Sequence, residues 1–279
     1  MAKINKDEVT SEDINIGVIL GERIFSAKDV KGVSYRMLQY WHSQGFLLRT
    51  QAAGEWRKFD LYEMVWIQMI EEFRALGVEV KNIAESLKRA FVYNSSEMGF
   101  NETEFIWPGE NSQTPDSASS TLSNPFYFML ALNLSIQMKC FLSMYVFKGG
   151  RCQSFVHTDF AGDGNYLDRV GQFAEGFINI SITNIVAQIL STKDLPDFIE
   201  LSLFTTDELV MIRFIREGLL RELKVKYISK NIYELKINLD LPLEEALRAT
   251  FLILLSPYKK ISYKGDGPKL FSITRRDKA

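Results

Sequence analysis

The stretch VSYRMLQYWHSQGFL, residues 33–47, decides the fold of the first part of the chain. Ser34 is a favourable N-cap residue, so we expect a helix from Tyr35 to about His42. Its core-facing side would carry three apolar side chains at helical spacing, Met37, Leu38 and Trp41. Its outer side would carry four others, Tyr35, Arg36, Gln39 and Tyr40. The stretch therefore predicts a short amphipathic helix with an accessible polar and aromatic side.

A second short helix is expected immediately before this one. The segment SAKDV, residues 26–30, follows Ser26 as a candidate cap, and Lys31-Gly32-Val33 makes a tight turn. Two short helices joined by a turn that contains glycine form a helix-turn-helix, whose second helix fits the major groove of DNA. Arg and Gln side chains read guanine and adenine edges or hold phosphates. The pattern predicts DNA binding.

The residues that follow favour a winged form of this motif. The arms LLRTQ (47–51) and EWRKF (55–59), joined around Gly54, would form a wing that lays Arg57 and Lys58 on the DNA backbone. Asp60 would then cap an amphipathic helix that ends at Gly77, and another helix would begin near residue 80. The core-facing residues of the longer helix are Met64, Ile67, Ile70 and Phe73.

Three ordered blocks, residues 33–47, 55–60 and 70–83, resemble the DNA-binding domain of the MerR family. That family shows a pattern close to VS-x-R-x-L-R-Y-Y-E-x-x-G-L, then a YR-x-Y wing and an LR-x-LG-x-S-L-x-E-I helix pair. The matching positions are Val33, Ser34, Arg36, Leu38, Tyr40, Gly45, Arg57, Asp60, Leu61, Gly77 and Ile83. The resemblance covers about a quarter of the chain, roughly residues 23–90.

The resemblance implies that Arg36 and Tyr40 contact DNA from the recognition helix and that Trp56 and Arg57 contact it from the wing. With their neighbours, the candidate DNA-binding residues are Ser34, Tyr35, Arg36, Gln39, Tyr40, Trp56, Arg57 and Lys58. Three positions depart from the family pattern: Gln39 replaces the usual Arg, Trp41 the second Tyr, and His42 the usual Glu.

The chain departs further from the family after this unit. MerR regulators usually continue into a long helix that pairs with its mate, whereas residues 93–124 are polar and acidic and rich in turn residues. Such a segment is typical of a linker, since it has little apolar surface to bury. We therefore expect an arm at 1–22, the winged helix at 23–92, a linker at 93–124 and a larger α+β domain at 125–279. Whether the chain forms a homodimer stays open.

Alternation and capping patterns predict the elements of the last part. Strands are expected at 126–136, 138–147, 152–157, 177–182 and 198–204, and helices at 166–177 and 184–191. For 126–136 the absence of helix-breaking residues leaves a helix as the alternative. Thr205 and Glu208 form a capping box for a helix whose apolar face runs on to Leu219 and Leu223. A hairpin around residues 230–231, a helix opened by Asp240 and Pro242, and a final hairpin around 265–267 complete the α+β unit. Residues 14–20 would form an arm or a strand.

Charge is distributed unevenly along a chain whose net charge is −2. Residues 28–58 carry six bases against two acids, which fits a phosphate-binding surface. Residues 256–279 carry seven bases against two acids, and we interpret them as a solvated surface strand in preference to a second DNA contact.

Several other functional classes find little support. The first twenty residues include acids where a signal peptide would be apolar, and no run of eighteen apolar residues occurs, so a cytoplasmic protein without a membrane contact is expected. Cys140 and Cys152, with His42 and His157, are too few for a zinc site. The acidic loop at 157–168 has the wrong spacing for an EF-hand. We expect no metal, no cofactor and no catalytic residues.

The sequence thus predicts a sequence-specific double-stranded DNA-binding protein, a bacterial transcription regulator. Its C-terminal domain would sense a small-molecule effector or mediate self-association. One alternative is a mobile-element accessory module, for excision or plasmid maintenance, that binds DNA or protein. Another is an enzyme domain with a DNA-targeting head, which would need Asp159, Asp163 and Glu175 to line one pocket.

Overall fold

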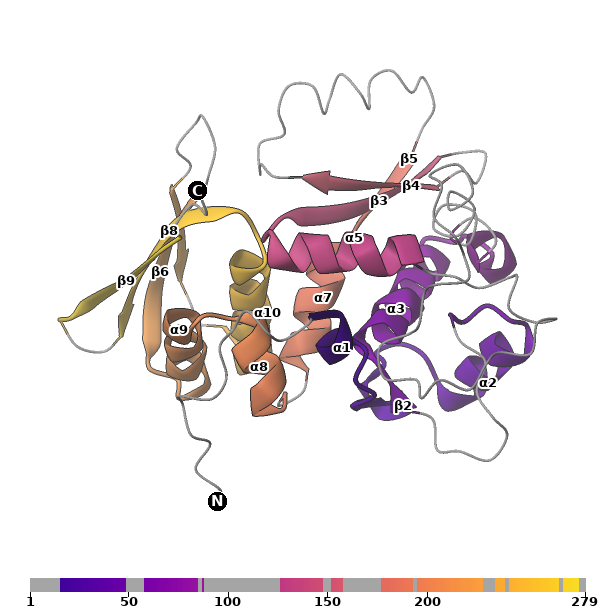
Figure 1. The fold of residues 1–279 in the computed structure, drawn as a ribbon, viewed down its shortest axis with the longest axis horizontal. Coiled ribbons are helices and arrows are strands. Elements are labelled where there is room, and N and C mark those ends of the chain that lie inside the picture. Colours follow the sequence, from indigo (N-terminus) through magenta and orange to yellow (C-terminus); the bar gives the residue numbers. More distant parts are fainter. Residues whose placement is uncertain are drawn as a thin grey trace.

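The computed structural model describes residues 16–48, 58–84, 87, 126–147, 152–157, 177–192, 195–227, 234–238, 241–265 and 268–275. The N-terminal helices of residues 35–43 and 61–75 lie on one side of the molecule and a four-stranded sheet lies at the opposite end (Figure 1). Buried apolar residues from Ile16 to Ile273 form a single connected cluster between them. The division into domains at 23–92, 93–124 and 125–279 stays a prediction, and the linker lies outside the described residues.

The N-terminal elements follow the predicted order. They are α1 (Ile16–Leu20), β1 (Phe25–Ser26), the 3-10 turn η1 (Ala27–Asp29), α2 (Tyr35–Ser43), β2 (Lys58–Phe59) and α3 (Leu61–Ala75). Residues 80–84 are helical as well. The predicted strand at 14–20 is wrong, because Ile16, Ile19 and Leu20 are buried at helical spacing. The first short helix is reduced to a single 3-10 turn.

The wing stays a prediction. Residues 49–57 lie outside the described part, and the end of the second predicted arm, β2, pairs antiparallel with β1. Phe25 faces Phe59 in this two-stranded sheet, and both side chains are buried. This pairing joins the segment before the helix-turn-helix to the segment that leads into α3.

The first ten residues of α3, 61–70, are buried around the whole circumference of the helix, which the sequence analysis did not foresee. Tyr62, Val65, Trp66 and Met69 are buried as fully as the predicted core face. This second face packs on α7 (Ile182–Ser191) and on α5 (Phe126–Gln137), where Trp66 meets the Phe128 ring edge-on at 5.6 Å. A helix that is apolar all round belongs in the middle of a core. The helix-turn-helix is therefore packed against the rest of the described chain.

The predicted strand at 126–136 is wrong, because this segment is helix α5. Its described buried apolar residues, Phe128, Met129, Leu132 and Ile136, recur at helical spacing, whereas Leu134 is exposed. Period-two alternation misled the prediction because almost every residue of the run is apolar, and a twelve-residue run without Gly or Pro is long for a strand. The next strands are as expected, β3 (Phe141–Phe147), β4 (Cys152–His157) and β5 (Phe177–Ser181), in the order β4-β3-β5.

The predicted strand at 198–204 is also wrong. Residues Asp197–Leu203 form helix α8, which buries Ile199 and Leu203 one turn apart and leaves Phe198 and Leu201 exposed. Glu200 of α8 accepts hydrogen bonds from the Arg216 guanidinium of α9. Successive residues of a strand point to opposite faces, so a strand would not bury both Ile199 and Glu200 against the same neighbours. A helix allows both to be buried.

The last part contains the elements α9 (Thr206–Arg216), β6 (Leu220–Tyr227), β7 (Glu234–Asn238), α10 (Leu243–Leu254), β8 (Tyr258–Gly265) and β9 (Leu270–Thr274). The Thr205–Glu208 capping box and both hairpins are confirmed, and the sheet order is β7-β6-β8-β9.

Two boundaries differ from the prediction. Helix α9 ends at Arg216, so Leu223 belongs to β6 and Leu219 lies exposed between the two elements. The N-cap of α10 is Pro242, and Asp240 lies outside the described residues. The predicted helix at 166–177 lies outside them as well, except for Phe177, which begins β5.

Candidate DNA-binding surface

Helix α2 is capped at both ends by residues adjacent to it in the sequence. The Ser34 hydroxyl accepts a hydrogen bond from the Met37 amide at 3.2 Å, which confirms the predicted N-cap. At the other end Gly45 has φ 67°, and the amides of Gly45 and Phe46 donate to the carbonyls of His42 and Trp41, both at 2.9 Å. This is a Schellman arrangement, which needs a residue tolerant of positive φ at Gly45.

One side of α2 is buried. Leu38 is fully buried and Trp41 is 2% exposed, while Met37 is half-buried against the same core. The predicted inner face is therefore confirmed. Since these side chains fix the rotation of the helix about its own axis, they also decide which residues face the solvent.

The other side of α2 is accessible. Tyr35 is 58% exposed and Tyr40 is 57% exposed, and Arg36 and Gln39 are exposed between them. Within the described residues, the side chains of Arg36 and Gln39 form no hydrogen bond or ion pair with the protein. Tyr40 touches the Phe46 ring edge-on at 6.4 Å. The structure thus groups four of the eight predicted DNA-binding residues on one exposed helix face, with Ser34 at its beginning.

Helix α3 holds the chain on both sides of α2. The Gln68 side-chain amide donates to the Lys31 carbonyl at 3.1 Å, just before α2, and the Trp66 indole N–H donates to the Phe46 carbonyl at 2.9 Å, just after it. These two positioning residues were missed by the sequence analysis. The signal that could have found them is the run Tyr62–Met69, in which both faces of the expected helix are largely apolar or aromatic.

The turn before α2 makes a contact that the sequence could not indicate. Lys31 forms an ion pair with Glu244 in the first turn of α10, far away along the chain. Gly32 has φ 74°, and a Cβ there would stand 3.1 Å from the Glu71 carboxylate. Lys31 was counted among the bases of a phosphate-binding surface, but in this structure its charge is matched by an acid.

The structure describes only one of the three predicted wing residues. Lys58 is exposed at the start of β2, while Trp56 and Arg57 lie outside the described residues. Their contribution to the surface around α2 stays a prediction.

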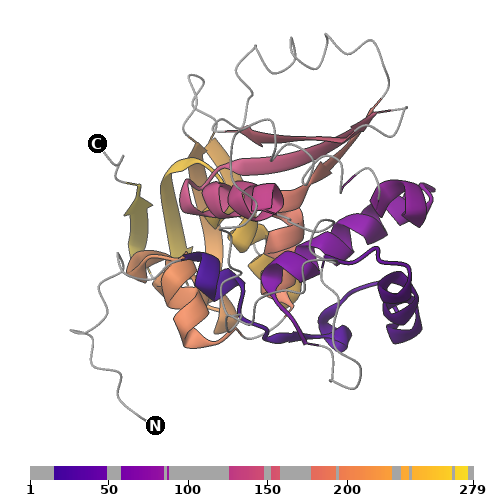
Figure 2. The same ribbon diagram turned by 45° about the vertical axis from the view of Figure 1, so that its right-hand side comes forward.

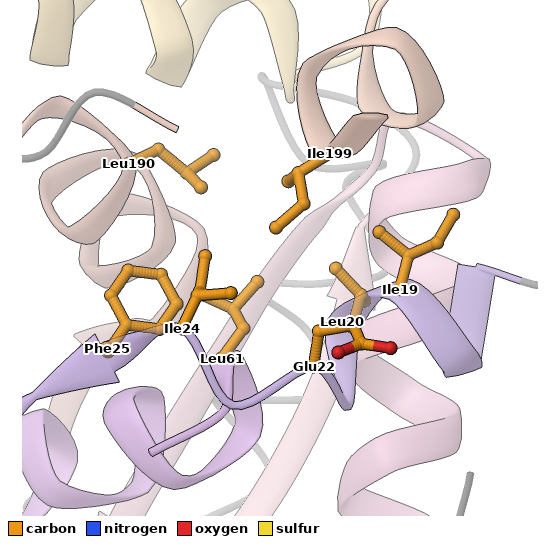
Figure 3. A pocket seen from close by; sticks show the side chains of 8 residues that line it. All are labelled: Ile19, Leu20, Glu22, Ile24, Phe25, Leu61, Leu190 and Ile199. Carbon is orange, nitrogen blue, oxygen red and sulfur yellow. The ribbon is translucent and has the colours of Figure 1, made fainter. Parts of the chain in front are cut away.

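A small apolar pocket lies behind the helix-turn-helix, where the chain from α1 to β1 meets α7 and α8 (Figure 3). Leu190 and Ile199 enter it from α7 and α8, and Leu61 enters it from the start of α3. Its remaining lining residues are Ile19, Leu20, Glu22, Ile24 and Phe25. The pocket shows that the helix-turn-helix and the later helices share a boundary at this point.

A cluster of buried charged groups lies away from α2, around Glu208. Glu208 is buried, and its carboxylate accepts hydrogen bonds from the Tyr258 hydroxyl at 2.6 Å and from the Thr205 amide at 2.7 Å. The Lys139 ammonium lies 3.6 Å from it and donates to the Leu203 carbonyl at 2.9 Å. Burial lowers the pKa of Lys139, while Glu208 partly offsets that effect. These contacts join α5, α8, α9 and β8, which is a structural role.

The described residues offer no evidence for the other functional classes. In them, no three His, Cys, Asp or Glu side chains are grouped so as to hold a metal ion. None of their helices is long and apolar enough to span a membrane. Asp159, Asp163 and Glu175, on which the enzyme hypothesis depends, lie outside the described part, so that hypothesis is untested.

Comparison with known proteins gives one match. Residues 23–90 match the model of a family described as MerR HTH family regulatory protein. No curated protein and no solved structure matches the chain. The match has the same boundaries as the resemblance found in the sequence, and it leaves residues 91–279 outside. Residues 23–90 are therefore similar to the helix-turn-helix of MerR regulatory proteins, and this match supports DNA binding and transcription regulation.

Proposed function

We propose that this protein is a sequence-specific transcription regulator that binds double-stranded DNA through the outer face of α2. The observation that carries the proposal is the exposure of Arg36 and Gln39 on a helix whose other side is anchored in the core. Arginine pairs with guanine and glutamine with adenine in the major groove. Tyr35 and Tyr40, on the same face, would contact the sugar-phosphate backbone and set the position of the helix.

Rigidity of α2 supports the same function. Base readout requires the helix to enter the groove in one orientation, and the contacts of Gln68 and Trp66 hold the segments before and after it. Because α3 also packs on α5 and α7, a change in the later helices could alter the position of α2. The proposed sensing of an effector by the C-terminal part would use this connection.

Selection of bound duplexes from a random double-stranded library tests the proposal. The wild type is expected to enrich a motif that the Arg36→Ala/Gln39→Ala variant does not enrich. The control variant Arg213→Ala/Arg248→Ala removes two exposed arginines from α9 and α10, and it should enrich the wild-type motif. Failure of the wild type to enrich any motif would refute a sequence-specific regulator. A palindromic motif would indicate a homodimer.

A further inference from the structure

The sheet β7-β6-β8-β9 has one covered face and one open face. The covered face carries Leu223, Val225, Ile261 and Tyr263, all buried, and the Phe214 ring of α9 packs edge-on against Tyr263. The opposite face carries the alternate residues of each strand. On its central strands these are Lys224 and Lys226 of β6 and Lys260, Ser262 and Lys264 of β8, of which all four lysines are exposed.

We call the residues of this open face the lysine face. Its edge strands add Glu234, Lys236 and Asn238 from β7 and Leu270, Ser272 and Thr274 from β9. With Glu222 of β6, the face holds five lysines against two glutamates, although the whole chain carries a small negative net charge. The structure thus gathers bases from three strands that are far apart in the sequence.

The register places like charges opposite each other at some positions and opposite charges at others. Lys226 of β6 faces Lys260 of β8, and Lys224 faces Lys236, whereas Lys264 faces Glu222 and Lys226 faces Glu234 on its other side. Directly opposed like charges destabilise an antiparallel pair, so Lys226 and Lys260 repel each other across the two central strands. Among the residues whose side chains the structure describes, Lys224 has an ion-pair partner, the Glu222 carboxylate at 3.7 Å, and Lys226, Lys260 and Lys264 have none. An anion on this face would relieve the repulsion.

Protection of a sheet edge would account for Lys236 of the edge strand β7, but it does not explain the four lysines of β6 and β8. Lysines that prevent edge-to-edge aggregation belong on edge strands, whereas β6 and β8 are the central strands of this sheet. The described edge strand β9 carries no lysine on this face. The arrangement is instead one of lysines with hydroxyl residues, the side chains that commonly bind the phosphates of DNA.

We propose that the lysine face binds the phosphate backbone of double-stranded DNA without reading its sequence. Lysines two residues apart on a strand are separated by about 6.7 Å, and neighbouring strands by about 4.8 Å. This spacing lets several lysines contact one backbone at a time. The paired strand residues that the structure describes on the open face include no aromatic residue on which single-stranded bases would stack, which favours a duplex. Among these described residues, Leu270 is the one exposed apolar side chain that could insert into a membrane.

The lysine face lies at the end of the molecule opposite to α2 in both views (Figures 1 and 2). The duplex held there is therefore a different segment from the one that α2 would read. The inference is independent of the proposed function of α2, since neither surface shares a residue with the other.

The test measures binding of a short duplex of unrelated sequence to the full chain over about 50 to 200 mM salt. To remove any contribution of α2, all proteins carry Arg36→Ala/Gln39→Ala. Adding Lys226→Gln/Lys260→Gln should weaken binding and reduce the magnitude of the slope of log K against log salt by about 2, close to 0.9 for each lost phosphate contact. The control Arg213→Gln/Arg248→Gln removes the same charge from α9 and α10 and should leave the slope unchanged.

Three further readouts separate the outcomes. The Lys226→Gln/Lys260→Gln variant should keep a cooperative thermal unfolding transition, because both substituted side chains are exposed. An unchanged slope in this correctly folded variant would overturn the proposal. So would lysine-dependent binding to phosphatidylserine vesicles without duplex binding, which would assign the face to a membrane. If the wild type selects no motif but the salt slope still depends on Lys226 and Lys260, the proposed function of α2 fails and the lysine face is supported.

Discussion

The indole N–H of Trp66 donates a hydrogen bond to the backbone carbonyl of Phe46 at 2.9 Å. Trp66 lies in the middle of α3, and Phe46 is the residue that follows the glycine cap of α2. The same ring meets Phe128 of α5. One side chain therefore joins the end of α2 to the later part of the chain, and the first prediction follows from it.

Trp66→Phe should lower the free energy of unfolding by about 1–3 kcal/mol, because it leaves the Phe46 carbonyl without this donor. Trp41→Phe is the matched control. It replaces another buried indole by the same smaller ring, and the Trp41 side chain forms no hydrogen bond within the described residues. Denaturant unfolding measures both. Equal losses in the two variants would show that the Trp66 hydrogen bond contributes little.

The Gly45 cap gives a second prediction. Gly45→Ala should cost about 1 kcal/mol, because alanine resists the positive φ, while no atom lies within 4 Å of the added Cβ. Gly45→Asn should cost less, because asparagine adopts this conformation more readily. Thermal unfolding of the two variants measures the difference. A greater loss for asparagine would indicate crowding rather than backbone strain.

The fragment 1–92 should not fold on its own. It would expose the second face of α3, where Tyr62, Val65, Trp66 and Met69 are now buried. At roughly 1.5–3 kcal/mol for each large apolar side chain, the loss is comparable to the whole stability of a typical domain. Circular dichroism and amide proton spectra of the fragment test this. Dispersed spectra and cooperative unfolding would show that the MerR-like segment is an autonomous domain, as the sequence analysis expected.

Stability should fall as the pH rises above about 10. Burial raises the pKa of the hydroxyls of Tyr227, Tyr258 and Tyr263 in the folded state. The unfolded tyrosines lose their protons near pH 10 while the folded ones keep theirs, so each contributes a loss of up to about 1.4 kcal/mol per pH unit. Lys139 acts in the opposite direction below about pH 10.5, because burial lowers its folded pKa.

Tyr258→Phe tests this pH dependence. Above pH 10 its free energy of unfolding should decline less steeply than that of the wild type. At neutral pH the variant should be less stable than the wild type, because the Glu208 carboxylate loses a hydrogen-bond donor. The exposed Tyr35→Phe serves as a control, since it should leave the slope unchanged. Identical slopes for wild type and Tyr258→Phe would contradict the assignment.

The Lys31–Glu244 ion pair should contribute less than about 1 kcal/mol to stability, because both side chains are about half exposed and the pair is screened by solvent. Glu244→Gln should instead strengthen DNA binding at low salt, because it leaves the Lys31 ammonium beside α2 without its acid. A double-mutant cycle with Lys31→Ala measures the coupling, and binding at two salt concentrations measures the second effect. Weaker binding by Glu244→Gln would show that the pair positions the turn before α2.

Local signals in the sequence determined much of this protein. Ser34, Asp60 and Thr205 predicted the starts of three helices, and Gly77 predicted the end of one, because caps depend on the nearest few residues. The three MerR-like blocks identified residues 23–90 for the same reason, since that motif is continuous in the chain. The four exposed residues of α2 follow from the period of one helix.

Two of the helices and the contacts between distant residues depend on the tertiary structure. Residues 126–137 and 197–203 became helices because their side chains pack on α3 and α9, and a uniformly apolar or short run carries no period of its own. The pairing of Lys31 with Glu244, and of Lys226 with Lys260, joins residues far apart along the chain. Helix caps depend on neighbours in sequence, whereas packing partners and strand register depend on neighbours in space, which a single sequence does not record.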